Sequence, residues 1–109
     1  MVSLQKITMD NMENIDKITQ EKIINLILAL LPNVKIYLFG SRARGTHHKW
    51  SDIDLALDAG SALPNVKIGE VKDVLAATNM PYKVDVLDFY TISADMQEMI
   101  KKDMKIWKN

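Results

Sequence analysis

A glycine–serine step followed by two closely spaced aspartates constrains this chain more than any other feature of its sequence. The apolar segment 34–39 ends at Gly40 and Ser41, ten residues follow, and the next apolar segment carries Asp52 and Asp54. A nearly continuous apolar run of this length is typical of a strand that is covered on both faces. We therefore expect a strand, a sharp turn, a polar loop and a second strand that carries two carboxylates.

The two carboxylates are expected on one face of the second strand. Successive side chains of a strand alternate between its faces, so Asp52 and Asp54 point one way and Ile53, Leu55 and Leu57 the other. Two neighbouring carboxylates repel each other unless a cation neutralises them. Mg²⁺ prefers oxygen ligands and keeps positions for water and substrate phosphates. The pair predicts a metal site, with ordinary surface carboxylates as the alternative.

The residues at the turn predict a phosphate site. Glycine lets the backbone approach a ligand closely, and backbone N–H groups and the Ser41 hydroxyl can donate to phosphate oxygens. Arg42 and Arg44 can add bidentate positive charge, although solvated loop arginines are the alternative. For Arg44 the two readings are equally supported. Neither Gly-Ser nor Asp-x-Asp is specific alone, but their order and spacing between two apolar segments are.

The segment GSRARGTHHKWSDID resembles the signature of the nucleotidyltransferases related to DNA polymerase beta, especially the minimal nucleotidyltransferases of prokaryotes. That superfamily has a third carboxylate on a later strand, which the resemblance places at Asp85 in YKVDVLD. Asp88 is the competitor, but it falls at the end of the expected strand and is assigned to the following turn. The resemblance implies a polymerase beta-like nucleotidyltransferase fold over almost the whole chain.

The resemblance also implies a reaction. It is the transfer of a nucleoside monophosphate, AMP from ATP, to a hydroxyl, with two Mg²⁺ ions at the centre. The implied catalytic and metal-binding residues are Asp52, Asp54 and Asp85. The implied nucleotide-binding residues are Gly40, Ser41 and Arg42. Minimal transferases are often encoded beside a HEPN-domain ribonuclease, so the implied acceptor is a HEPN toxin and the implied role is that of an antitoxin.

Two other functions stay open at this point. One is a binding module, an antitoxin that neutralises its partner by stoichiometric contact with a vestigial site. The intact Gly-Ser step and the three carboxylates argue against decay of the site. The other is a transferase acting on small molecules, which we disfavour because the sequence shows no acceptor-binding domain beyond the catalytic module.

The remaining sequence predicts one small α/β (α+β) domain, residues 1–109, with a small mixed β-sheet flanked by helices. The expected order is helix, strand, strand, helix, strand, helix. The first helix is capped by Asp10 or Asn11 and ended by Pro32. The expected strands are 34–39, 53–57 and 82–87. A second helix over 66–78 follows Pro64 and a cap near Ser61, and a last helix is capped by Thr91 or Ser93, before a tail over 105–109.

Composition narrows the class of protein. The 14 basic and 14 acidic residues cancel, which does not suggest a general nucleic-acid or membrane surface. There is no cysteine, and no apolar run approaches the roughly 20 residues of a membrane span. We therefore expect a cytoplasmic protein without membrane or direct nucleic-acid binding.

Several residues of the loop and of the last helix have two readings. His47 and His48 are expected in a solvated loop rather than at a metal, because adjacent side chains project in different directions. Trp50 is expected to pack on the domain rather than stack on a base. The stripe of Met96, Met99 and Met104 predicts either core filling or a partner surface.

Overall fold

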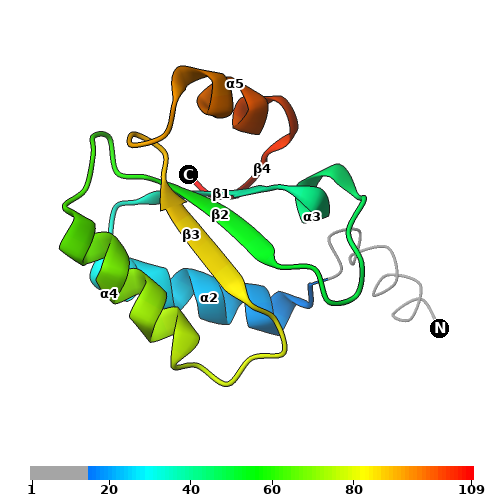
Figure 1. Cartoon of the computed structure of the whole chain (residues 1–109). Coiled ribbons are helices and arrows are strands. Elements are labelled where there is room, and N and C mark those ends of the chain that lie inside the picture. Colours follow the sequence, from blue (N-terminus) through cyan, green and yellow to red (C-terminus); the bar gives the residue numbers. More distant parts are fainter. Residues whose placement is uncertain (1–14) are drawn as a thin grey trace.

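The computed structural model describes residues 15–109 as a four-stranded sheet with helices on both faces (Figure 1). The elements are α2 (Lys17–Leu30), β1 (Lys35–Phe39), α3 (Ser41–Arg44), β2 (Ile53–Asp58), α4 (Asn65–Ala76), β3 (Val84–Asp88), α5 (Ala94–Asp103) and β4 (Lys105–Lys108). The strand order is β3-β2-β1-β4, with β2 and β3 parallel and β1 antiparallel to both of its neighbours. The predicted mixed sheet flanked by helices is confirmed.

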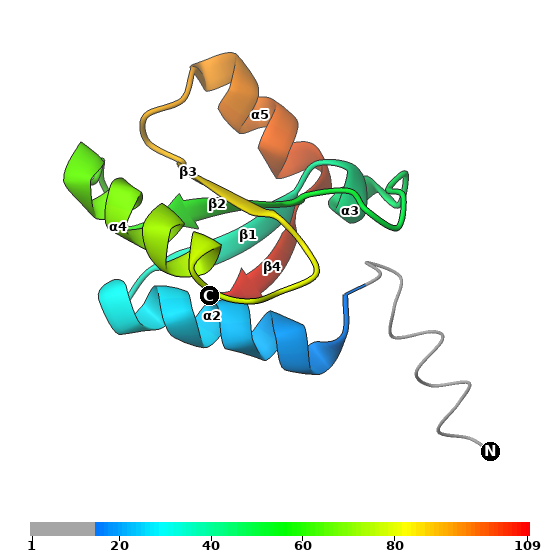
Figure 2. The same ribbon diagram turned by 60° about the horizontal axis from the view of Figure 1, so that its bottom comes forward.

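Helices α2 and α4 lie side by side on one face of the sheet, as Figures 1 and 2 show. The residues of β2 that alternate with its aspartates, Ile53, Leu55 and Leu57, are fully buried on this face. They pack with aliphatic side chains of the two helices in one core cluster that includes Ile23, Ile27, Val71 and Leu75. Burial of aliphatic side chains at roughly 1.5–3 kcal/mol each makes this cluster the main source of the fold's stability.

Helix α5 covers only part of the opposite face (Figure 1). Its Ile100 packs with Ala56 of β2 and with Phe89, which follows β3. Asp54 and Asp85 are register partners of the parallel β2–β3 pair, and they precede the residues that α5 covers. The carboxylates therefore lie at the ends of the strands that α5 leaves accessible.

The helix caps were predicted with mixed success. The predicted caps Asp10 and Asn11 lie outside the described residues, and α2 begins after Asp16, whose Oδ1 accepts a hydrogen bond of 2.6 Å from Thr19 N. Ser93 caps α5, as predicted, by accepting a 3.1 Å hydrogen bond from Met96 N.

The predicted cap near Ser61 is wrong. Helix α4 begins at Asn65, directly after Pro64, and has no side-chain cap. The segment before it is held in another conformation, because Asp58 Oδ1 accepts from Gly60 N at 2.9 Å and Asp88 Oδ2 accepts from Leu63 N at 2.7 Å. Helix α4 therefore begins only after the proline.

The expected tail over 105–109 is also wrong, because its first four residues form β4. This strand pairs antiparallel with β1, and Tyr37 is the register partner of Ile106. A four-residue segment has too few alternating positions to be recognised as a strand from its own sequence. Within the described part of the chain, no helix is both long and apolar enough to cross a bilayer.

Candidate functional site

The turn after β1 and the carboxylate of Asp54 are in direct contact. Gly40 has a φ of 78°, a conformation that side-chain-bearing residues rarely adopt. A Cβ at this position would collide with Asp54 Oδ2 and lie 3.3 Å from Asp54 Cγ. Glycine is thus required for two reasons, the backbone conformation and the space that the carboxylate occupies. The structure brings together the two halves of the motif predicted from the sequence.

The three candidate carboxylates lie near one another where β2 and β3 begin. Asp54 is the register partner of Asp85, and Asp52 precedes it by two residues. Burial raises the pKa of Asp54, and the charges of Asp52 and Asp85 raise it further, while Arg44 and Arg42 act in the opposite direction. Such mutual repulsion is the electrostatic condition that a bound cation would relieve.

The chemistry of these carboxylates fits a divalent cation better than their spacing does. All three offer oxygen ligands, the kind that Mg²⁺ prefers. Among residues 15–109, however, no three side chains of histidine, cysteine, aspartate or glutamate are grouped closely enough to hold a metal ion. The assignment of Asp52, Asp54 and Asp85 as metal ligands therefore stays a prediction.

Arg42 is used inside the protein. Only 1% of the residue is exposed, and its Nε and Nη2 donate to the carbonyl oxygen of Ser51 at 3.1 and 2.8 Å. Nη2 also donates to the Lys49 carbonyl at 3.3 Å, and the guanidinium lies 4.9 Å from the ring centroid of Tyr82. The expected direct contact of Arg42 with phosphate is not supported by these contacts. Instead, Arg42 fixes α3 to the residue that precedes Asp52.

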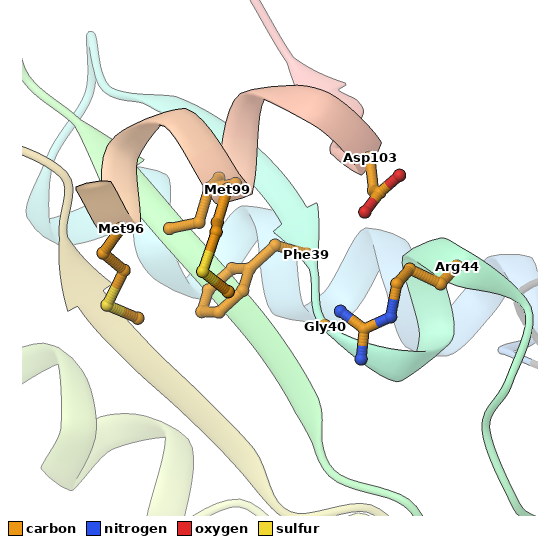
Figure 3. Close-up of a pocket in the computed structure, with 7 residues that line it drawn as sticks. Phe39, Gly40, Arg44, Met96, Met99 and Asp103 are labelled. Atoms are coloured by element: carbon orange, nitrogen blue, oxygen red, sulfur yellow. The ribbon is translucent and has the colours of Figure 1, made fainter. Parts of the chain in front are cut away.

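Arg44, two residues later, is exposed and lies on the rim of a cavity beside Gly40 (Figure 3). The cavity has a volume of about 120 Å³ and lies between α5, α3 and the end of β1. Its other lining residues are Phe39, Met96, Met99, Ile100 and Asp103. Sequence reasoning missed this cavity, because its two walls are far apart in the chain and only the fold brings them together.

Asp88, the competitor of Asp85, has a structural role. It is the last residue of β3, not part of the turn as expected, and only 3% of it is exposed. Its Oδ2 accepts from Leu63 N at 2.7 Å and its Oδ1 from Tyr90 N at 2.9 Å, so it organises the loops on either side. In the register of β2 and β3 it is the partner of Leu57, whereas Asp85 is the partner of Asp54.

The other loop residues differ from one another in exposure. Trp50 was expected to pack on the domain, and this is wrong: 72% of it is exposed, and its ring contacts the Lys49 ammonium, 5.1 Å from the centroid. Ser51 folds the loop back instead, because its hydroxyl accepts from His48 N. His48 is exposed, whereas His47 is half-buried, and its Nδ1 is buried without a hydrogen-bond partner within residues 15–109.

Comparison with known proteins gives a consistent family. Residues 13–109 match the family model described as "Polymerase beta, Nucleotidyltransferase". The chain is 34% identical over 77 residues to the probable protein adenylyltransferase MntA of Haemophilus influenzae, covering 71% of this chain and 68% of that protein. It is therefore similar to about two thirds of that relative's length.

Two solved structures are similar in fold and sequence. One is a toxin–antitoxin with AMP-PNP, with a TM-score of 0.69 and 34% identity over 81% of this chain and 71% of that chain. The other is the MNT antitoxin in complex with a tri-AMPylated HEPN toxin of Shewanella oneidensis, with a TM-score of 0.62 and 28% identity over 81% of this chain and 67% of that chain. The predicted resemblance to minimal nucleotidyltransferases is confirmed.

Proposed function

Because the chain belongs to the polymerase beta nucleotidyltransferase family, we propose that it transfers AMP from ATP to a hydroxyl of a HEPN-domain partner and thereby acts as an antitoxin. The observation that carries this proposal is the contact between Gly40 and Asp54, with Asp85 paired to Asp54 on the next strand. Nucleotidyl transfer needs this combination, a turn that admits phosphates next to carboxylates that can hold cations.

In this proposal the three aspartates, Asp52, Asp54 and Asp85, would hold two Mg²⁺ ions. Bound there, the ions would neutralise the triphosphate and make the attacking hydroxyl a better nucleophile. The order of the strands separates two sides of the site, since β2 with Asp54 lies between β1, which Gly40 follows, and β3, which carries Asp85. The donor triphosphate belongs on the Gly40 side and the acceptor hydroxyl on the Asp85 side. In-line displacement requires such an arrangement on opposite sides of the phosphorus.

The residues of the turn then position the donor. Gly40 leaves the backbone open to close approach, and the Ser41 hydroxyl makes no hydrogen bond within the described residues, so it is available to a phosphate oxygen. Arg42 keeps this turn and Asp52 in register through the Ser51 carbonyl. Positioning of this kind accounts for much of the rate enhancement in phosphoryl transfer.

The test uses the chain, MgATP and a HEPN-domain protein as the candidate partner. The wild type should add the mass of AMP to the partner, and Asp54→Asn should reduce the rate at least about a hundredfold, because it loses several kcal/mol of charge stabilisation. Asp73→Asn, an exposed aspartate on α4, is the matched control and should transfer at the normal rate. If Asp54→Asn protects cells from the toxin as well as the wild type does, neutralisation by binding alone explains the function and the proposal is wrong.

A further inference from the structure

Two cavities follow the outer edge of β3, the strand at one end of the sheet. The larger has a volume of about 410 Å³, and its lining includes Val84 and Asp85 at the start of the strand. The smaller has a volume of about 180 Å³, and its lining includes Val86 and Leu87 further along. Helix α4, which lies beside β3 in Figures 1 and 2, supplies the other wall, and its Lys72 lines both cavities. Together they form one groove along the strand, which we call the edge groove.

The backbone of β3 presents hydrogen-bonding groups to the edge groove. Ile53 is the register partner of Val84, and Ile53 N donates to the Lys83 carbonyl at 2.9 Å. Alternate residues of a parallel strand bond to its neighbour, so with this register Val84 and Val86 turn their N–H and C=O groups outward, away from β2. In the described part of the chain, no strand pairs with this edge. An open edge beside a helix can bind an extended polypeptide as an added strand.

Two lysines give the edge groove positive charge. Lys72 lines the groove from α4, and Lys83 lines its larger cavity. Both are exposed, and within residues 15–109 neither makes an ion pair. Asp85 also lines the larger cavity, but it shares the opposite face of the sheet with Asp54. The α4 side of the groove therefore fits an acidic side chain of a ligand, because ammonium groups make strong charge-assisted hydrogen bonds with carboxylates.

The side chains of an added strand would alternate between the two faces of the sheet. The residue opposite Asp85 would point to the face that carries Asp54, with its Cβ roughly 5 Å from that of Asp85. The residues before and after it would point to the face of α4, where Val84 and Val86 pack against the core and Lys72 lines the groove. A hydroxyl opposite Asp85 would thus meet the carboxylates, while α4 would contact its neighbours.

We propose that an extended segment of the acceptor protein binds in the edge groove as a fifth strand of the sheet. Its backbone pairs with Val84 and Val86, its reacting hydroxyl lies opposite Asp85, and an acidic side chain next to the hydroxyl pairs with Lys72. This inference rests on the proposed function, because only a transferase brings a reacting hydroxyl to these carboxylates. It adds how the acceptor is recognised, namely by an open strand edge and a lysine of the catalytic domain itself.

The competing occupant is a second copy of this chain, with β3 paired to β3. The acidic residue of β3 on the α4 face is Asp88, which has the register position opposite Leu57. Its carboxylate already accepts hydrogen bonds from Leu63 N and Tyr90 N, so a second copy would offer Lys72 no free carboxylate from this strand. An acceptor segment with its own acidic residue fits the charge of the groove better.

The experiment measures the dissociation constant between the full chain and the HEPN-domain protein of the transfer test by calorimetry, without ATP. Ala76→Trp fills the larger cavity, and Ala77→Trp is its control, an exposed alanine one residue later that lines neither cavity. Lys72→Glu reverses the charge of the groove, and Lys22→Glu makes the same change at an exposed position on α2. Circular dichroism shows that each variant is folded.

We expect Ala76→Trp to weaken binding about tenfold, as the loss of a central contact does, and Lys72→Glu to weaken it several-fold. Both controls should bind as the wild type does. Unchanged affinity in Ala76→Trp and Lys72→Glu, or no binding by the wild type, would overturn the inference.

Hydrogen exchange separates an added strand from other ways of docking. On binding, the outward N–H groups of Val84 and Val86 should exchange at least about tenfold more slowly, because they gain hydrogen bonds. Unchanged exchange at both amides in the complex would overturn the inference. Slow exchange at both in the chain alone, together with a dimer in sedimentation, would assign the edge to a second copy and would also overturn it.

The outcome is separable from that of the proposed function. If the wild type adds no AMP to the HEPN-domain protein while binding still depends on Lys72 and Ala76, the edge groove stands as its docking site and the transfer is wrong. If AMP is added but neither groove variant changes affinity, the transfer stands and the edge groove is wrong.

Discussion

The two faces of the sheet use the same strands for opposite purposes. On β2, Leu55 is fully buried beneath α2 and α4, whereas Asp54, its neighbour in sequence, is only half-buried on the face that α5 covers in part. The first face collects aliphatic side chains, with the hydrogen-bonded carboxylate of Asp88 at the end of β3, and the second holds three carboxylates that repel one another. Side chains alternate between the two faces of a strand, so the residues of β2 that stabilise the fold alternate with those of the candidate site.

The comparison implies that burial of side chains on the covered face stabilises the fold, and that the carboxylates on the accessible face destabilise it. A site that holds repelling carboxylates is destabilising, and it persists only because the surrounding structure fixes it. If this is correct, substitutions on the two faces should differ in which property they change, and one variant and three pairs of variants can show whether they do.

The largest effect on stability is expected at Leu55. Leu55→Ala should reduce the free energy of unfolding by about 3 kcal/mol, because it removes a fully buried side chain and leaves a cavity under the two helices. Urea denaturation measures this loss. The folded fraction should bind MgATP with unchanged affinity, since the Asp54 face is untouched. Impaired binding by the folded variant would show that the two faces are not independent.

A smaller loss of stability is expected at Arg42, which holds the loop beside the accessible face. Arg42→Ala should cost about 2 kcal/mol, because the carbonyls of Ser51 and Lys49 lose their donors. Arg42→Lys should recover little, since an ammonium cannot bond as the guanidinium fork does. The matched control, Arg44→Ala, removes an exposed arginine and should leave the urea midpoint unchanged. Equal losses at the two positions would contradict the structural role of Arg42.

Two glycines with the same φ of 78° provide the third comparison. From the backbone alone, alanine should cost about 1 kcal/mol at Gly45, which is left-handed, and more at Gly40, whose ψ of −159° places it in a region essentially limited to glycine. Only at Gly40 would the new Cβ also meet Asp54, whereas at Gly45 no atom lies within 4 Å. Gly40→Ala should therefore abolish transfer, and Gly45→Ala should retain it. Retained transfer in Gly40→Ala would disconnect the turn from the site.

Prediction from sequence succeeded where neighbouring residues carry the information. The alternation of Asp52 and Asp54 with buried Ile53 needs only the geometry of a strand, and the contact of Gly40 with Asp54 follows from two strands joined by a loop. The predicted cap near Ser61 failed because a distant group decides it: Asp88, on β3, holds the backbone of Leu63 before α4.

The other differences from what the sequence predicts have the same origin, while phosphate contact by Arg42 stays a prediction. Arg42 and Arg44 are indistinguishable in the segment RAR, and the short helix α3 turns one inward to the Ser51 carbonyl and leaves the other exposed. Trp50 looks like a packing residue by composition, but the loop that Arg42 holds by its backbone leaves the indole in solvent. Residues 105–108 form β4 because they pair with the edge of β1, a strand that lies far away in the sequence.

The smallest effects are expected from two aspartates with opposite pKa shifts, compared without metal in EDTA. Hydrogen bonds from Thr19 lower the pKa of Asp16, so its ionised form stabilises the fold, and this stability is lost as the pH falls through that lowered pKa. Burial and the charges of Asp52 and Asp85 raise the pKa of Asp54, so its ionised form destabilises the fold once the pH exceeds that raised pKa.

At neutral pH, Asp16→Asn should melt below the wild type and Asp54→Asn above it. The difference for Asp54→Asn should shrink as the pH falls from that raised pKa toward about 3.9, the ordinary carboxyl pKa, whereas the difference for Asp16→Asn should shrink only below it. Thermal melts from neutral to acidic pH measure both. If Asp54→Asn melts below the wild type at neutral pH, the carboxylates do not repel as the accessible face requires.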